Sequence, residues 1–216
     1  MATKPVLDFY PPVRQLRSLF YGVTDGVLTA PTPCPGWSVG DLLDHLTELT
    51  LVFTRAARRG GAVLDQDAGA IDAAGISTAP RAPSAAHLHP QWRGRLPALL
   101  EDLATAWADP AAWTGTAQAG GVTMPADRIG IVAVNELTLH GWDLAKATGQ
   151  DFAADPRTLL VLATFLATAD GSATAPDGTA GGSPVPLPMV VDVEDEASLL
   201  EQVVGLSGRD PHWRRS

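Results

Sequence analysis

The chain has few cysteines, few basic residues and no long apolar run, and each shortage excludes a class of protein. Its single cysteine rules out an intrachain disulfide framework. The formal charge of −9 argues against a nucleic-acid partner, because phosphate binding needs clustered Lys and Arg. No apolar run approaches the roughly 20 residues of a membrane helix, and the N-terminus lacks the apolar core of a signal peptide. We therefore expect a cytoplasmic protein that binds neither nucleic acid nor a membrane.

Apolar side chains recur at spacings of three and four residues in several long segments, which is the period of an amphipathic helix. Hydrophobic residues make up 45 % of the 216 residues, enough for one sizeable domain with an extension. Helices are predicted from about Pro12 to Leu28, from Ser38 to just before Gly60, from about Pro90 to Trp107 and from Asp127 to Thr148. The predicted fold class is therefore all-α, with a four-helix bundle over residues 1–150.

The connections and the C-terminal part have weaker patterns. Ala62 to Ala86 is rich in Ala, Gly, Asp and Pro and predicts a long loop. Trp113 to Thr123 predicts an excursion or short hairpin around Gly120-Gly121. Residues 151–216 are predicted to be a C-terminal helical extension packed on the bundle. Its parts are a helix from Asp155-Pro156 to about Ala169, a flexible link from Gly171 to Gly182, an extended segment, and a short helix from Asp195 to Leu206.

The helix predicted from Asp127 to Thr148 carries three polar groups on one face. Glu136 and His140 are four residues apart, so they lie about one turn apart on the same side of a helix. Asp143 returns to that face. Burying such groups among apolar residues is costly unless something compensates them, and a metal ion is one such compensator. Two ligands do not make a site, and His45 on the second predicted helix is the best candidate for a third.

Two segments of the chain resemble a known family. They are PCPGWSVGDLLDHL (Pro33 to Leu46) and NELTLHGWDLAKATG (Asn135 to Gly149). In this order and spacing the chain resembles the mycothiol-dependent maleylpyruvate isomerase family, which belongs to the DinB-like metal-binding four-helix bundles. The ending LLEQVVGLSGRDPHW (Leu199 to Trp213) resembles an actinobacterial branch described only as metal-binding.

The resemblance implies a metal centre and a particular bundle. It implies that His45, Glu136 and His140 hold a divalent metal, usually zinc. It also implies the DinB arrangement, in which the loop from Ala62 to Ala86 is the long crossover between the second and third helices. The crossover and the Gly171 to Gly182 link are the best candidates for gating the metal cavity.

The ligand chemistry favours a catalytic metal over a structural one. Two neutral imidazoles and one carboxylate leave a divalent ion with a net charge of about +1, and three protein ligands with one open position are typical of catalytic zinc. Zinc is preferred on ligand type, with Ni²⁺, Fe²⁺ and Mn²⁺ as alternatives. The open position can take water, a substrate oxygen or a thiolate.

Other polar and aromatic groups near the motifs leave alternatives open. Asp143 is either an acceptor that orients a ligand histidine or a surface carboxylate. Glu48, three residues after His45, is either an acid–base group or a solvated side chain. Glu48 and Asp143 are the two candidates for a catalytic role. Trp37 and Trp142 are interpreted first as core residues and second as parts of a pocket wall.

Three further groups are expected to lie outside the site. Cys34 precedes the second helix, and His45 lies about seven residues inside that helix, roughly 10 Å along it, so ligation by Cys34 would need the turn to fold back. His87 and His89 alternate in a proline-flanked loop with no evident third ligand, and His212 has no evident partner.

Two functions follow as expectations. The first is a mycothiol-dependent S-transferase or isomerase, in which a metal-activated thiolate attacks a small electrophile; the resemblance implies the thiol. The family's isomerase carries a separate C-terminal domain that helps to bind its thiol. Residues after about Asp151 predict no such domain, so S-transfer is favoured over maleylpyruvate isomerisation. The alternative is a non-catalytic metal-binding protein that serves sensing, sequestration or assembly. A homodimer is compatible with either.

Overall fold

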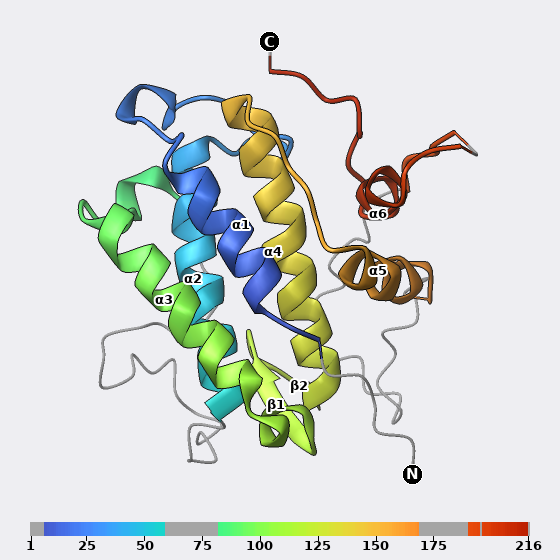
Figure 1. The fold of residues 1–216 in the computed structure, drawn as a ribbon. Helices are drawn as coiled ribbons and strands as arrows, with labels where there is room; N and C mark the ends of the chain where they lie inside the picture. The colour runs from blue at the N-terminus through green and yellow to red at the C-terminus, as the bar shows by residue number, and fades with distance from the viewer. Residues whose placement is uncertain (1–6, 59–81, 169–189, 195, 216) are drawn as a thin grey trace. The chain divides into compact units, whose positions relative to one another are not determined.

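Four helices lie side by side in the N-terminal part of the chain (Figure 1). The computed structural model describes residues 7–58, 82–168, 190–194 and 196–215. The helices are α1 (Tyr10–Phe20), α2 (Val39–Arg58), α3 (Trp92–Ala108) and α4 (Ala126–Thr148), with short 3-10 helices η1 (Asp25–Val27), η2 (Ala85–His87) and η3 (Pro110–Trp113) between them. The described residues contain a single sheet of two strands. The predicted all-α bundle is therefore confirmed.

The described chain divides into two compact units, one from the N-terminus to Ala153, which also includes Arg215, and one from Ala154 to Arg214. In the first unit each long helix turns an apolar stripe toward the others. The largest fully buried members of these stripes are Leu16, Leu42, Leu43, Leu46, Leu96, Leu100, Leu103, Trp107, Ile129, Leu137 and Leu144. Burying one such side chain stabilises the fold by about 1.5–3 kcal/mol, so the bundle has a continuous core of its own.

An aromatic cluster of Phe9, Trp107 and Trp113 lies beside the N-terminal part of α4. The rings of Phe9 and Trp107 stack with centroids 5.3 Å apart, and Trp113 meets Trp107 edge-on at 5.0 Å. Both indoles are satisfied, because Trp107 Nε1–H donates to the carbonyl of Phe53 and Trp113 Nε1–H donates to the carbonyl of Trp107. A Cβ on Gly130 of α4 would lie 2.6 Å from Trp113 and 2.9 Å from Trp107. Glycine there lets α4 lie directly against the indoles.

The two helices that carry the predicted metal ligands have well-defined ends. At the start of α2, the Asp41 carboxylate accepts hydrogen bonds from the Ser38 backbone and hydroxyl, and the Asp41 backbone N–H donates to Ser38 Oγ. These reciprocal bonds form a capping box, with Asp in the position usually taken by Glu or Gln. α4 follows Pro125 and ends at Gly149, which has φ +70°. A left-handed glycine is a common helix stop, so both predicted ends of α4 are confirmed within a residue.

The first helix is shorter than predicted. Periodicity extended it to Leu28, whereas α1 ends at Phe20 and η1 follows after a turn. Gln150 contacts this helix end, because its side-chain amide donates to the carbonyl of Leu19 and lies 2.4 Å from where a Cβ on Gly22 would be. A contact with a residue so distant in sequence cannot be read from local periodicity.

The segment between α3 and α4 forms a short hairpin. The sequence predicted either an excursion or a short hairpin for Trp113 to Thr123. β1 (Thr116–Ala119) pairs antiparallel with β2 (Val122–Pro125). Gly120 and Gly121 connect them with φ of +56° and +81°. Positive φ at both central residues is what a two-residue hairpin turn of type I′ requires.

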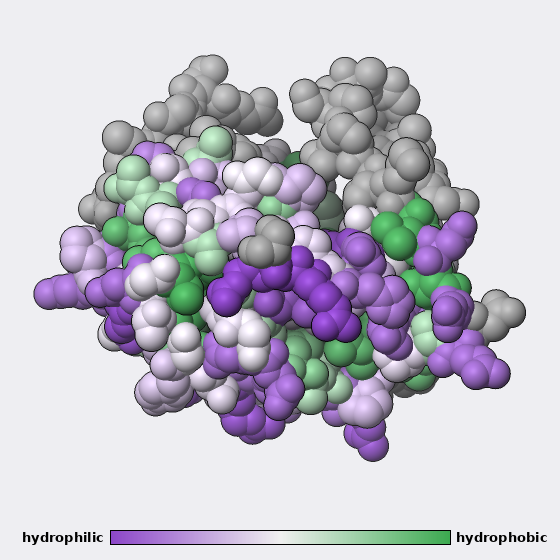
Figure 2. All heavy atoms as spheres, turned by 90° about the horizontal axis from the view of Figure 1, so that it is seen from above, coloured by the Kyte–Doolittle hydropathy of each residue, from purple (hydrophilic) through white to green (hydrophobic). Residues whose placement is uncertain are grey.

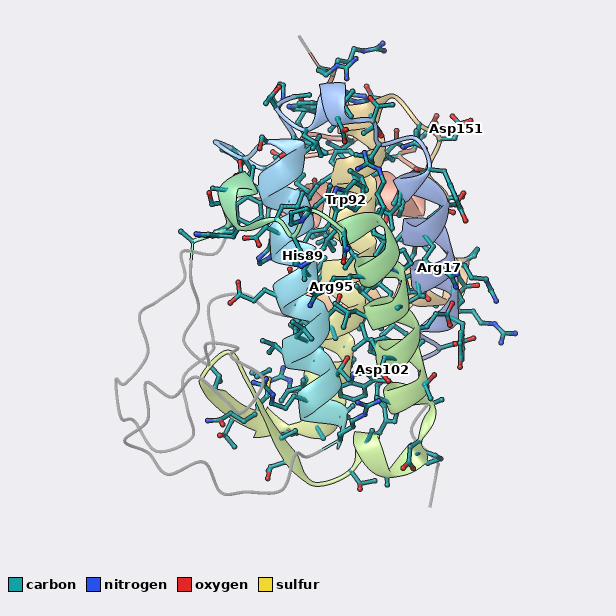
Figure 3. The ribbon with its side chains drawn as sticks, turned by 90° about the vertical axis from the view of Figure 1, so that its left-hand side faces the viewer. Arg17, His89, Trp92, Arg95, Asp102 and Asp151 are labelled. Atoms are coloured by element: carbon teal, nitrogen blue, oxygen red, sulfur yellow. The ribbon has the colours of Figure 1, made fainter. Side chains whose placement is uncertain are left out.

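The surface of the first unit carries charges that tie α3 to its neighbours. Asp102 of α3 pairs with Arg58 of α2, and Arg17 of α1 pairs with Glu101. Trp92 points instead between the helices, toward Phe20 of α1 at a centroid distance of 5.9 Å (Figure 3).

The described residues seen in Figure 2 are mainly hydrophilic, with hydrophobic residues in small separate groups. None of the helices in the described ranges combines the length and hydropathy that a membrane span requires.

The second unit contains α5 (Pro156–Thr168) and α6 (Leu199–Leu206), which pack against each other. α6 begins later than predicted, because Ser198 and Glu201 form a reciprocal capping box there. A Cβ on Gly205 would lie 2.7 Å from the carbonyl of Val191, so the segment before α6 touches the helix backbone. Most of the predicted Ala62 to Ala86 crossover and the whole Gly171 to Gly182 link lie outside the described residues.

Candidate metal centre

Three potential ligands converge where α2 packs against α4. His45 comes from α2, and Glu136 and His140 lie one turn apart on α4. Glu136 Oε2 lies 3.0 Å from His140 Nε2 and 3.9 Å from His45 Nε2. One ligand atom from each residue lies within 4.8 Å of the other two. The sequence prediction named these three residues, and the fold brings them together.

The donor set fits a divalent metal ion. Ligand atoms that surround a tetrahedral ion at about 2.1 Å are about 3.4 Å apart, and the observed separations of 3.0 and 3.9 Å lie on either side of that value. Imidazole and carboxylate donors suit zinc and several first-row metals alike. The three residues could therefore hold a metal after small side-chain movements, and the donors alone do not select which metal.

The cluster is buried on one side and accessible on the other. The side chain of His140 is 6 % exposed and that of Asp143 is 0 % exposed. His45 and Glu136 keep 21 % and 29 % of their side-chain surface. A small molecule from solvent would therefore approach on the side of His45 and Glu136.

Asp143 lies behind His140 on the same helix. Its Oδ2 atom is 2.9 Å from His140 Nδ1, on the opposite ring nitrogen from the one that faces Glu136. A proton on Nδ1 donated to Asp143 leaves Nε2 free to act as a ligand, which is how many metal-bound histidines are oriented. Of the two interpretations of Asp143, this contact supports the one in which its carboxylate orients a ligand histidine. Its side chain has no exposed surface, so it is not a surface carboxylate.

The buried charges shift two pKa values in opposite directions. Burial alone would lower the pKa of His140, but its hydrogen bonds with Asp143, Cys34 and Glu136 outweigh burial and hold that pKa well above its ordinary value. Burial alone would raise the pKa of Glu136, but the His140 and His45 imidazoles outweigh it and hold that pKa far below its ordinary value. Without a metal, the cluster therefore favours an imidazolium next to a carboxylate.

Cys34 belongs to this cluster, and the expectation that it lies outside is wrong. Its Sγ atom is 3.1 Å from Asp143 Oδ2 and 3.9 Å from His140 Nδ1. The prediction used the distance from Cys34 to His45 along α2. The turn before α2 instead folds back, so Cys34 lies next to Asp143 and His140 of α4. Cys34, His140 and Asp143 form a second group of three potential ligand atoms within 4.8 Å of one another. The two groups share His140 through its two ring nitrogens.

Trp37 lies against both imidazoles. Its ring meets His45 edge-on with centroids 4.8 Å apart and stacks on His140 at 5.9 Å with an interplanar angle of 24°. Trp37 is half-buried, so it is not part of the fully buried core, and its ring borders the two imidazoles. Trp142 instead is buried, with Lys146 Nζ lying 5.3 Å from its ring centroid.

The remaining candidates lie apart from these groups. Glu48 is half-buried on α2 and belongs to neither group of ligand atoms. His87 lies with Nδ1 3.7 Å from Asp44 Oδ2, and His89 Nδ1 accepts a hydrogen bond from the backbone of Gln91. Within the described ranges no metal-ligand group includes either histidine or His212.

Comparison with known families and proteins gives one match. Residues 12–145 match the family model of the mycothiol maleylpyruvate isomerase N-terminal domain. The matched range runs from the first turn of α1 to near the end of α4 and contains every residue of both ligand groups. No curated protein and no solved structure matches the chain.

Proposed function

Because the chain belongs to the mycothiol maleylpyruvate isomerase N-terminal domain family, we propose that it binds one divalent metal, most favourably zinc, and acts as a thiol-dependent S-transferase or isomerase. The proposed ligands are His45, Glu136 and His140. The proposed co-substrate is a low-molecular-weight thiol of the mycothiol type, and the second substrate is a small electrophile. The thiol's identity rests on the family, and the ligand set rests on geometry.

The observation that carries the proposal is the convergence of His45 Nε2 and His140 Nε2 on Glu136 Oε2 at 3.9 and 3.0 Å. Three donors of this kind that keep one position open are typical of catalytic rather than structural sites. The exposed edges of His45 and Glu136 give a substrate access to that position. A buried structural site would have no need of such access.

The chain's own residues divide the remaining tasks. Asp143 holds the proton on His140 Nδ1, so that Nε2 is available as a donor. Trp37 stacks on the face of His140 and meets His45 edge-on, so it restricts the movement of both imidazoles. A divalent ion with these ligands would favour the thiolate over the thiol near neutral pH. Only a few per cent of a free thiol of pKa near 8.5 is ionised there, so this preference supplies the nucleophile.

The proposal is tested on cobalt-substituted protein. Mycothiol is added, and the visible and near-ultraviolet spectrum is followed for a sulfur-to-metal charge-transfer band. The same samples are then incubated with a panel of electrophiles and examined for S-conjugates. A band in the wild-type protein that is absent from His140→Ala but present in the control His212→Ala, together with conjugate formation, supports the proposal.

Two results would distinguish metal and thiol binding from catalysis. A charge-transfer band without any conjugate would reduce the function to metal and thiol binding, which is the non-catalytic alternative. The absence of any band at saturating thiol, with cobalt bound and no conjugate formed, would overturn thiol activation altogether.

A further inference from the structure

The turn from Thr32 to Trp37 connects η1 to α2 and is closely braced. Thr32, 5 % exposed, accepts a hydrogen bond at Oγ1 from the backbone of Cys34 and donates from Oγ1 to the carbonyl of Trp37. The backbone N–H of Trp37 donates to the carbonyl of Cys34 at 3.1 Å. Gly36 has φ +80°, a conformation that favours glycine. These contacts fix Cys34 and Trp37 relative to each other.

The turn is also fixed to α2. Pro31 and Ser38 form an isolated antiparallel bridge across its base. Ser38 is then held by Asp41 in the capping box at the start of α2. The helix that carries His45 and the turn that carries Trp37 are therefore one continuous braced element.

This element meets His140 on two sides. Trp37 stacks on the face of the His140 ring at 5.9 Å, and Cys34 donates its thiol proton to Asp143 Oδ2 at 3.1 Å. The same Oδ2 atom lies 2.9 Å from His140 Nδ1. Glu136 faces the other nitrogen of the ring, at 3.0 Å from Nε2. The turn therefore limits both the rotation of the imidazole and the movement of its carboxylate partner.

We propose that the Thr32–Trp37 turn is a positioning element of the metal centre, which orients His140 through the Trp37 ring and through the Cys34–Asp143 hydrogen bond. This inference rests on the proposed metal site at His45, Glu136 and His140. Cys34 acts through Asp143 and is not a metal ligand in this arrangement, because its sulfur lies on the Nδ1 side of the ring. Trp37 contacts His45 as well, so one side chain aligns ligands from two helices.

The test uses two pairs of variants and a control. Trp37→Leu removes the ring and Trp37→Phe keeps an aromatic face; Cys34→Ala removes the donor and Cys34→Ser keeps one. Trp142→Leu is the control, because it removes a buried indole only two residues from His140 on α4. Cobalt affinity is measured by competition with a chelator, and the visible d–d spectrum and the thermal midpoint are recorded for each variant.

We expect Trp37→Leu and Cys34→Ala to weaken cobalt binding by roughly tenfold to a hundredfold and to change the d–d spectrum, as loss of an orienting contact does in other metal sites. Trp37→Phe and Cys34→Ser should recover most of the affinity. Trp142→Leu should lower the thermal midpoint while leaving affinity and spectrum unchanged.

Three results would overturn the inference. If Trp37→Leu and Cys34→Ala behave like Trp142→Leu, the turn has a structural role alone. If wild-type protein binds two cobalt ions with a thiolate band before any thiol is added, and the band vanishes in Cys34→Ser, then Cys34 is itself a ligand. If wild-type protein binds no metal, the proposed function fails together with the inference, and this is evident before any variant is compared.

Discussion

Asp143 Oδ2 lies 2.9 Å from His140 Nδ1, on the next turn of the same helix and with no exposed side-chain surface. A carboxylate buried this completely is costly unless it is paired, and the contacts with the imidazole and the Cys34 thiol offset part of that cost. Asp143 and Cys34 lie on the Nδ1 side of the His140 ring, whereas Glu136 lies at Nε2. The contacts that hold the imidazole are therefore on the side away from the proposed metal.

Replacing Asp143 with asparagine tests this relationship. Asp143→Asn keeps the size of the side chain but removes its charge, and we expect metal affinity to fall by roughly tenfold to a hundredfold. Affinity is measured by chelator competition with zinc or cobalt. Asp102→Asn on the surface of α3 is the control and should leave the affinity unchanged. Equal affinity in Asp143→Asn and wild-type protein would mean that Asp143 does not orient a ligand.

The three proposed ligands should be individually necessary for full occupancy. We expect purified wild-type protein to hold about one divalent metal per chain, and His45→Ala, Glu136→Ala and His140→Ala to lose most of it, because two remaining donors bind weakly. Elemental analysis after extensive dialysis gives the metal content. His212→Ala, which changes a histidine exposed at the surface, should retain it. Full occupancy in the His45 and His140 variants would refute the ligand set.

Metal binding should release a proton at neutral pH. The pKa of His140 lies well above its ordinary value, so the imidazole is protonated in the metal-free protein, and a metal must displace that proton. Titration calorimetry in buffers of different ionisation enthalpy measures the number released. That number should fall as the pH rises through the pKa of His140, and apparent affinity should rise over the same range. Binding heats that do not depend on the buffer would contradict this.

The ionisation of His140 and Glu136 should make the stability of the metal-free protein depend on pH. The raised pKa of His140 contributes stability that is complete below its value in the unfolded chain and lost as the pH rises through its folded pKa. The lowered pKa of Glu136 contributes stability that is complete above its unfolded value and lost as the pH falls through its folded pKa. Urea unfolding of the apoprotein should therefore give a free energy of unfolding that declines toward alkaline pH, and Glu136→Gln should flatten that decline.

Removing the metal should lower stability without unfolding the bundle. The apolar stripes on α1 to α4 form a core that does not depend on a metal ion. Metal at a hundredfold excess over Kd adds about 2.7 kcal/mol, which corresponds to a Tm increase of roughly 5–10 °C for a chain of this size. Thermal unfolding with and without a chelator measures the difference. An apoprotein without any cooperative transition would refute the prediction.

Two helical glycines should respond to alanine in opposite directions. Gly130→Ala places a methyl group 2.6 Å from Trp113, and we expect it to destabilise the fold by about 1–3 kcal/mol. Gly94→Ala on α3 meets nothing within 4 Å, and removing glycine from an exposed helix should stabilise the fold by about 1 kcal/mol. Chemical denaturation measures both. A shift of the same sign in the two variants would mean that the indole contact does not govern Gly130.

The parts of the fold that local patterns determine were predictable from the sequence. Periodic apolar residues define α2, α3 and α4, and Gly149 marks the end of α4 within a residue. The spacing of Glu136 and His140 placed both on one helix face, and the family resemblance supplied His45 from another helix. The fold places ligand atoms of all three within 4.8 Å of one another.

The parts that depend on distant contacts were not predictable. Gln150 contacts the last turn of α1 from 131 residues away, and the sequence near Phe20 does not indicate that contact. Gly22, two residues after Phe20, is the local signal for an early helix end. Cys34 reaches Asp143 because Thr32 and Gly36 fold the turn back. The signal that could have indicated this is the Thr-x-Cys-x-Gly-Trp pattern itself, since a threonine hydroxyl and a left-handed glycine are turn-forming groups.

The aromatic cluster around Gly130 has a consequence for how this protein can change. Gly130 and His140 are ten residues apart on α4, so the indole packing and the ligands are separated by about 15 Å of rigid helix. Substitutions more than about 7–10 Å apart usually have independent effects on stability. Replacing His140 therefore leaves the anchoring of the N-terminal part of α4 intact. A chain in which His140 is replaced should therefore still fold, with the indole packing at Gly130 unchanged.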